Sequence, residues 1–230
     1  MLEREKKLRG LLFLGGRFDY TPGEVALLNV PFVCCSYTNC FGSLREEDFA
    51  SVSIDDRAAA CEAVEHLIGL GHRRIAAVVP SCADRSISEL RYRGYCTAME
   101  QAGLPVEPEL VVETGGSFEM AETYAAVEKL LGRGTAFTAV FTLSDTMAMA
   151  AIKALTDHGL RVPEDCSVVG IDGIPLSAYT IPTLTTLAQP AEEMGRESVR
   201  ILLDLVEGTG EARHVLVEPQ LRRGASTAPV

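Results

Sequence analysis

The chain has 230 residues and a net charge of −11, from 21 basic and 32 acidic side chains. This length suffices for one large or two modest domains, and a hydrophobic content of 47% suffices for a packed core. The acidic balance argues against binding the phosphate backbone of nucleic acids, and no apolar run approaches the roughly 18 residues of a membrane span.

In chain order, short apolar runs that end in glycine, proline or an acid predict strands, and amphipathic runs between them predict helices. The predicted strands are Leu11–Leu14, Pro31–Ser36, Val52–Ile54, Ile75–Pro80, Glu109–Glu113, Ala136–Thr142, Ser167–Ile171, Leu184–Leu187 and His214–Glu218. The predicted helices are Gly23–Asn29, Arg57–Leu70, Ser86–Gln101, Phe118–Leu131, Asp145–His158 and Ala191–Val206. This alternation predicts an α/β fold with doubly wound parallel sheets.

Polar residues mark several ends of these elements. Ser86 and Glu89 have the spacing of a capping box, and Ser117 is the predicted N-cap of the next helix. The last residues, from Gly224 on, are predicted to be frayed because they follow the last strand and are small and polar.

The seven cysteines indicate a reducing compartment. Their number is odd, no C-x-x-C occurs, and several lie within apolar runs, so we expect free thiols in the cytoplasm. The charged start of the chain has no apolar stretch typical of a secretory signal. Metal ligation by Cys34, Cys35 and Cys40 is the alternative, but their spacing fits no zinc pattern, so we expect neither a metal nor a cofactor.

Two carboxylates follow predicted strands in the third quarter of the chain. Asp145 follows one strand and Asp172 the next. Because parallel strands end at the same edge of a sheet, and open α/β sheets bind ligands there, these acids predict a small-molecule site. Arg85, Arg91 and Phe118 lie near other strand ends, and Ser144 precedes Asp145. A guanidinium, a ring and carboxylates suit a polyhydroxylated or heterocyclic ligand.

Each of these residues also has a purely structural interpretation. Asp145 can be a helix N-cap, Phe118 an ordinary core residue and Arg91 a surface arginine. A structural role is harder to assign to Asp172, because it follows a run that is typical of a buried strand and a carboxylate there needs a partner.

The sequence carries no strong signal of catalysis. There is no G-x-G-x-x-G, no phosphate-binding P-loop, no H-E-x-x-H and no G-x-S-x-G, and the four histidines are scattered. We therefore expect a binding protein and not an enzyme.

Five segments together resemble the effector-binding domain of LacI/GalR-type transcription regulators. They are V-E-H-L-I-G-L-G-H-R-R-I-A from Val64, R-Y-R-G-Y from Arg91, the segment around Ser144, G-L-R-V-P-E-D-C-S-V-V-G-I-D-G from Gly159 and I-P-T-L-T-T-L-A-Q-P from Ile181. The order and spacing of these segments agree with the family from about Leu8 to the C-terminus.

The resemblance implies a type I periplasmic-binding-protein fold, with two Rossmann-like subdomains joined by three crossovers and a ligand in the cleft between them. The N-terminal subdomain would comprise residues 1–55 plus 190–208, and the C-terminal subdomain residues 56–189 plus 209–230. The family's DNA-binding helix-turn-helix and the first elements of its first subdomain have no counterpart in the sequence. The first subdomain is therefore expected to be incomplete, with an exposed sheet edge that self-association would cover.

The resemblance also implies roles for individual residues. The effector, a sugar or related metabolite, would contact Arg91, Asp172, Phe118 as a stacking ring, Ser144, Arg85, Ser36 and Leu14. The protein would form a homodimer along the helices that begin near Phe118 and Thr146 and the loop Ile174–Ile181. Operator DNA would be bound only through the absent helix-turn-helix, and no membrane would be involved.

A sugar-binding protein of an ABC transporter shares this fold and is the alternative. The absence of a signal sequence and the seven thiols favour the regulator.

Overall fold

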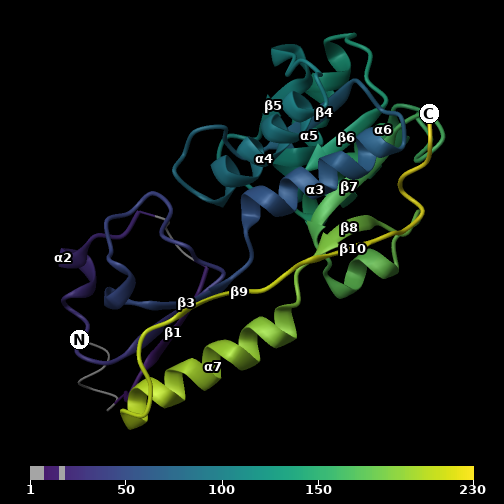
Figure 1. The fold of residues 1–230 in the computed structure, drawn as a ribbon. Helices are drawn as coiled ribbons and strands as arrows, with labels where there is room; N and C mark the ends of the chain where they lie inside the picture. Colours follow the sequence, from purple (N-terminus) through teal and green to yellow (C-terminus); the bar gives the residue numbers. More distant parts are fainter. Residues whose placement is uncertain (1–7, 16–18) are drawn as a thin grey trace. The chain divides into compact units, whose positions relative to one another are not determined.

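The computed structural model describes residues 8–15 and 19–230, and the chain divides into two compact units (Figure 1). The first unit consists of Met1–Asp55 and Pro190–Glu218, and the second of Asp56–Gln189 and Pro219–Val230. The chain therefore passes from one unit to the other three times, after Asp55, Gln189 and Glu218. The predicted α/β class with parallel sheets is confirmed.

The first unit is built on a parallel sheet of four short strands. In spatial order these are β1 (Leu11–Leu14), β2 (Phe32–Cys35), β3 (Ala50–Ser53) and β9 (His214–Leu216). Helix α7 (Ala191–Glu207) packs on β1, β2 and β3 and buries Met194, Ser198 and Ile201. These residues recur at helical spacing, so they form one face that meets the sheet. Two short elements, α2 (Pro22–Val25) and η1 (Glu46–Asp48), complete the unit.

The second unit is built on a larger sheet of six strands. In spatial order these are β10 (Gln220–Arg222), β8 (Thr185–Ala188), β7 (Ser167–Asp172), β6 (Ala139–Thr142), β4 (Ile75–Val79) and β5 (Val111–Glu113). Strand β10 runs antiparallel to β8, and the other pairs are parallel. The near-continuous apolar sequences of β4, β6 and β7 are buried, as expected for strands that are covered on both faces.

Four helices of the second unit connect these strands. They are α3 (Asp56–Gly69), α4 (Ile87–Gln101), α5 (Met120–Gly132) and α6 (Asp145–Asp157), with the short turns η2 (Pro108–Leu110) and η3 (Pro175–Ala178). Helix α3 packs against α4, and α5 packs against α6. Gly94 permits the first of these contacts, because a Cβ atom there would lie only 2.7 Å from the Cβ of Ala60 on α3.

Strand β9 belongs to the first unit, which differs from the expected boundaries. The sequence analysis placed residues 209–230 together in the second subdomain. In the structure β9 pairs with β3, with Ser51 opposite His214 and Ser53 opposite Leu216. The third passage between the units therefore lies after Glu218 instead of between residues 208 and 209.

The C-terminal residues are not frayed, so that prediction was wrong. Ser226 bonds to β7 through its backbone carbonyl, which accepts from Val168 N at 2.7 Å, and its hydroxyl donates to Val168 O at 2.6 Å. The same hydroxyl accepts a hydrogen bond from Thr185 N on β8, and Val230 N donates to Leu70 O. The tail therefore fastens two strands and the end of α3 together.

Two helix starts also differ from the prediction. Helix α5 begins at Met120 with Glu119 at the N-cap, and Ser117 accepts a hydrogen bond from Glu119 N in the preceding loop. Ser86 does cap α4, but Glu89 accepts from the amide of Arg85 and not from that of Ser86.

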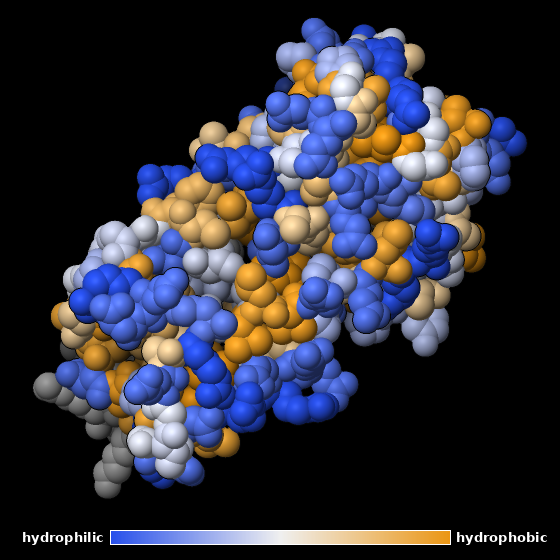
Figure 2. Space-filling model, in the orientation of Figure 1, coloured by the Kyte–Doolittle hydropathy of each residue, from blue (hydrophilic) through white to orange (hydrophobic). Residues whose placement is uncertain are grey.

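Charged and apolar side chains are interspersed on the surface. Hydrophilic residues (blue) cover much of the face in Figure 2, and apolar residues (orange) appear between them in both units. Within residues 8–15 and 19–230, no helix has both the length and the apolar character that crossing a membrane requires.

Candidate functional site

The predicted ligand residues of the second unit lie near the carboxyl ends of its parallel strands. Asp172 is the last residue of β7, and Ser144 and Asp145 follow β6. Arg91 lies about one turn into α4, after the loop that follows β4. Backbone topology thus brings groups that are up to 81 residues apart in sequence to one edge of the sheet.

Arg91 is the centre of this edge and is almost fully buried, with 2% of its side chain exposed. Its Nε donates to Asp56 Oδ1 at 2.9 Å, and its Nη1 donates to Asp172 Oδ1 at 3.3 Å and to the carbonyl of Leu143. Burial alone would lower the pKa of Arg91, but the charges of Asp56 and Asp172 outweigh it and raise the pKa. The guanidinium is therefore permanently charged, and the surface interpretation of Arg91 is wrong.

Asp172 is the exposed member of this group, with 29% of its side chain accessible. Both of its side-chain hydrogen bonds, from Arg91 and from Gln189 Nε2 at 2.8 Å, go to Oδ1. Its second carboxylate oxygen accepts no bond from the residues that the structure describes. One guanidinium and two carboxylates, those of Asp56 and Asp172, leave the group with a formal charge of −1.

The backbone at Asp172 has an unusual conformation. Its φ of +121° lies in a region that side-chain-bearing residues rarely adopt, and Gly173 follows with φ of +69°. A Cβ atom on Gly173 would lie 2.6 Å from Ala188 Cα, so the chain after β7 lies directly against the end of β8. Gln189 N reinforces this contact by donating to Asp172 O at 2.9 Å.

The two carboxylates that the sequence analysis paired have different environments. Asp145 is fully buried; its Oδ2 accepts from Ile174 N at 2.8 Å and its Oδ1 from the hydroxyl of Thr186. Burial raises the pKa of Asp145 to about 6, and these two hydrogen bonds oppose the rise. Asp145 therefore fixes the loop after β7 and strand β8, and Ser144, not Asp145, is the N-cap of α6.

The remaining predicted residues are not part of the bonded group around Arg91. Ser144 is buried and its hydroxyl accepts from Met147 N. Phe118 is half-buried in the loop before α5, and Arg85 is exposed, with φ of +56° and its amide bonded to Glu89. Their contact with an effector stays a prediction.

Two further predicted residues belong to the first unit. Leu14 ends β1 with 76% of its surface exposed, and Ser36 follows β2 with φ of +61° and its amide bonded to Val52 O at 2.8 Å. Both lie at the carboxyl ends of parallel strands, like Asp172 in the second unit. Their contact with an effector also stays a prediction.

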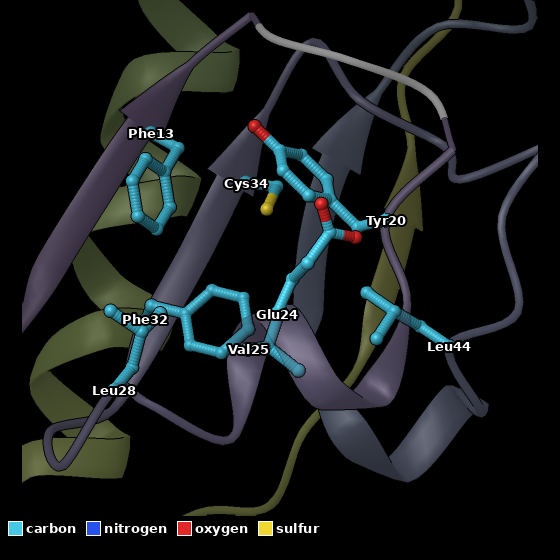
Figure 3. Close-up of a pocket in the computed structure, with 8 residues that line it drawn as sticks. All are labelled: Phe13, Tyr20, Glu24, Val25, Leu28, Phe32, Cys34 and Leu44. Carbon is cyan, nitrogen blue, oxygen red and sulfur yellow. The ribbon is translucent and has the colours of Figure 1, made fainter.

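The first unit holds an apolar pocket of about 140 Å³ that the sequence analysis did not predict. Figure 3 shows Phe13 and Phe32 projecting from β1 and β2 on the same side, next to Tyr20 and Glu24. The complete lining is Phe13, Tyr20, Glu24, Val25, Leu28, Phe32, Cys34 and Leu44. Phe13 and Phe32 meet edge to face, with ring centroids 5.8 Å apart.

All seven cysteines are free thiols. Cys34 lines the pocket, and burial raises its pKa to about 12, so it is a poor nucleophile and a poor metal ligand. No cluster of three or more histidine, cysteine or acidic side chains suited to a metal ion occurs among residues 8–15 and 19–230.

Sequence reasoning missed two residues of the group around Arg91, Asp56 and Gln189. Both are polar residues next to predicted element ends, but their partners lie 35 and 17 residues away. The only signal in the sequence was the acid at the end of the buried strand β7, which requires hydrogen-bond donors from somewhere in the fold.

Known proteins resemble this chain over nearly its whole length. A family model described as a periplasmic binding protein-like domain matches residues 64–227. The HTH-type transcriptional regulator MalR of Clostridium butyricum is 35% identical over 225 residues, which are 95% of this chain and 64% of that protein. The chain thus spans somewhat less than two thirds of the length of this relative.

Solved structures show the same similarity. The transcriptional regulator CelR in complex with cellobiose superposes with a TM-score of 0.83 at 33% identity, covering 98% of this chain and 70% of that one. A LacI family transcriptional regulator from Enterococcus faecium with bound ribose superposes with a TM-score of 0.81 at 26% identity, covering 98% and 82%.

Proposed function

Since the chain belongs to the LacI family of transcription regulators and carries a periplasmic binding protein-like domain, we propose that it senses a small effector for such a regulator. The observation that carries the proposal is the Arg91–Asp172 pair at the carboxyl edge of the six-stranded sheet. A buried, permanently charged donor beside a half-exposed acceptor can bond to a hydroxyl group in both directions. Neither group is arranged as a nucleophile with its base, so the site is one for binding.

The charge of the site favours an uncharged ligand. Asp56 and Asp172 together outweigh the positive charge of Arg91, so an anionic ligand would meet a net negative site. A sugar has hydroxyl groups that donate to the second oxygen of Asp172 and accept from guanidinium groups. The cellobiose and ribose of the two structural neighbours are ligands of this class.

The proposal is tested by calorimetric titration with cellobiose, ribose and glucose 6-phosphate, after a thermal-shift screen of a wider sugar panel. We expect an uncharged sugar to bind and Asp172→Ala to abolish its binding while leaving the fold intact. Asp157→Ala removes an ion-paired carboxylate near the end of α6 and serves as the control. Equal affinity of the wild type and Asp172→Ala for the sugar would exclude this site. If glucose 6-phosphate bound tightly and the uncharged sugars did not, the preference for an uncharged ligand would be wrong.

Residues of the first unit are tested in the same titration. Binding that weakens in Leu14→Ala or Ser36→Ala would support a ligand held by both units. Affinity that depends on Phe118 and Arg85 but on neither of these residues would confine the site to the second unit.

We propose that the protein acts as a cytoplasmic homodimer. Leu176, Tyr179 and Ile181, in and after η3, are exposed by 56%, 82% and 95%, and so many large apolar residues in one short segment are typical of an interaction surface. Ile181→Asp is expected to shift the protein toward the monomer in sedimentation velocity. Val230→Asp introduces the same charge at another exposed apolar residue and serves as the control.

The coupling to DNA would run through a helix-turn-helix segment of the kind that the name of MalR indicates. A ligand that binds two conformations with different affinity shifts their populations, and a coupling of about 1–3 kcal/mol suffices for regulation. The net charge of −11 favours a DNA contact made by such a segment and not by the surface of these 230 residues.

A further inference from the structure

Two residues with no assigned role bond directly to the Arg91–Asp172 pair. Gln189 holds Asp172 twice, through its side chain (Nε2 to Oδ1, 2.8 Å) and through its backbone (N to O, 2.9 Å). Asp56 holds Arg91 from the other side, at 2.9 Å from Nε. The four side chains therefore form one chain of hydrogen bonds within the second unit, in the order Gln189, Asp172, Arg91, Asp56.

The positions of the two outer members in the chain are notable. Asp56 is the first residue of the second unit after the passage at Asp55, and Gln189 is the last residue before the passage to Pro190. The hydrogen-bonded chain thus joins two of the three places where the polypeptide leaves this unit. Pro219, at the third passage, takes no part in it.

The backbone makes this connection stiff. Asp172 is held at φ of +121°, and Gly173 lies against Ala188, the residue before Gln189. A residue in this region of φ stays there only when its surroundings enforce it. A displacement of the Asp172 carboxylate is therefore expected to move Ala188 and Gln189 with it.

We infer that Gln189 and Asp56 are positioning residues that connect the ligand-binding pair to the two passages between the units. They orient Asp172 and Arg91 for the effector and, conversely, transmit the occupation of this pair to the polypeptide at Asp55–Asp56 and Gln189–Pro190. The inference rests on the proposed function for its ligand, but the connection itself exists without ligand.

Hydrogen exchange with mass spectrometry tests the connection in the unliganded protein. Gln189→Met keeps the length of the side chain and removes its donor. We expect faster exchange by about fivefold in peptides that cover 168–174 and also in those that cover 52–58, at the other passage, because the effect travels through Asp172 and Arg91. Peptides of the C-terminal tail, 225–230, should be unchanged, which shows that the unit stays folded.

Matched variants separate this effect from a general loss of stability. Gln220→Met makes the same change on β10. Asp55→Asn makes the same change as Asp56→Asn at the neighbouring residue, which is exposed. We expect Asp56→Asn to speed exchange at 168–174 and both controls to leave it unchanged. An effect of Gln189→Met that stays within 168–174 and 186–194, with 52–58 unchanged, would overturn the inference.

A swap of the two groups gives the sharper test. Gln189→Glu replaces the donor with a second carboxylate and breaks the side-chain bond to Asp172, and Asp172→Asn alone removes the charge that Arg91 faces. Together the two changes restore the bond with donor and acceptor exchanged and keep one carboxylate near Arg91. We expect the double variant to return exchange at 52–58 to within about twofold of the wild type. Exchange that equals the sum of the two single effects would also overturn the inference.

The outcomes distinguish this inference from the proposed function. If no sugar of the panel binds but the exchange results hold, the proposed effector class is wrong and the connection stands. If a sugar binds through Asp172 while Gln189→Met and Asp56→Asn leave exchange at the distant passage unchanged, the site stands and the connection is wrong.

Discussion

The four-stranded sheet of the first unit and the six-stranded sheet of the second are both parallel at their centres, but the residues in and beside their outer strands differ. In the second unit, Arg133 donates to the carbonyls of Glu109 and Val111 beside the outer strand β5. The opposite outer strand, β10, follows Pro219 and carries Gln220 and Arg222. Charged side chains, prolines and short strands are the usual means of protecting a sheet edge.

In the first unit the outer strand β1 is also short, but it contains neither a charged side chain nor a proline. Its sequence is Leu11-Leu12-Phe13-Leu14, and among residues 8–15 and 19–230 it pairs with β2 alone. Phe13 and Leu14 are exposed by 38% and 76%, on opposite faces of the strand. Among the described residues, therefore, the outer strands of the second unit carry charged or proline residues, whereas β1 of the first unit presents an apolar edge.

The largest effect is expected at the helix contact of the second unit. Gly94→Val places atoms where the carbonyl of Arg57 and the Cβ of Ala60 already lie, so α3 and α4 must separate. Overpacking of this kind costs about 3 kcal/mol or more. Gly195→Val, on α7 of the first unit at a position with open space, serves as the control, with a change of less than about 0.5 kcal/mol because valine has a slightly better helix propensity than glycine.

Urea unfolding followed by circular dichroism measures the free energy of unfolding of both variants. Equal losses at the two glycines would show that the packing of the second unit is more tolerant than the close approach of α3 and α4 implies.

The next effect is expected at the C-terminal tail. Ser226→Ala removes the hydroxyl that links Thr185 N and Val168 O, and it leaves the buried amide of Thr185 without this acceptor. A buried donor left without a partner costs about 1–3 kcal/mol. The midpoint of urea unfolding should fall accordingly, whereas Ser117→Ala, in a surface loop, should leave it nearly unchanged.

The helices and the C-terminal tail of the second unit show what the sequence could and could not predict. Apolar runs and their spacing identified nearly every strand and helix, because those signals lie within about ten residues. The tail from Gly224 resembled a frayed end because its small polar residues carry no such period. Its bonds to β7 and β8 link residues about 40 to 60 positions apart, which a local pattern does not record.

The same limit applies to the candidate site. Asp172 was recognisable because an acid after a buried strand needs partners, and Arg91 because it lies near the end of a predicted strand and because the resemblance gives it an effector contact. Gln189 and Asp56 were missed since their neighbours are set by how β8 and α3 meet the end of β7. Strand β9 was assigned to the wrong subdomain for a related reason: its sequence predicts a strand, but not which sheet it joins.

A smaller effect is expected from pH, again in the second unit. Burial lowers the pKa of His66 and His72, and His72 Nε2 donates to the carbonyl of Ala228, a bond that requires the proton on this nitrogen. Because the folded-state pKa lies below the unfolded value of about 6.5, the unfolded chain takes up protons first as the pH falls. Stability is complete above about pH 6.5 and declines below it.

Asp145 acts in the opposite direction. Its pKa of about 6 lies above the value of an unfolded aspartate, so its contribution is complete at low pH and is lost as the pH rises through 6. Comparing the wild type with His72→Gln between pH 7 and pH 5 removes this common term. The wild type should lose more stability over this range than the variant, and parallel curves would show that His72 does not titrate on unfolding.

The smallest effect on stability, and the most direct test of the comparison, is expected at β1. Leu14→Lys places a charge on the unprotected edge and should change the free energy of unfolding by less than about 0.5 kcal/mol, because Leu14 is mostly exposed. Its effect should appear in association: if β1 pairs with β1 of a second copy, the lysine charges repel and self-association weakens.

Leu216→Lys is the matched control. It makes the same change on β9, the other outer strand of this sheet, where His214 bonds to Ser51 and to the carbonyl of Glu46. Sedimentation velocity of both variants in the Ile181→Asp background removes the proposed dimer contact from the measurement. If both variants weakened association equally, β1 would be no more prone to pairing than β9. The two sheets would then differ in size but not in the protection of their edges.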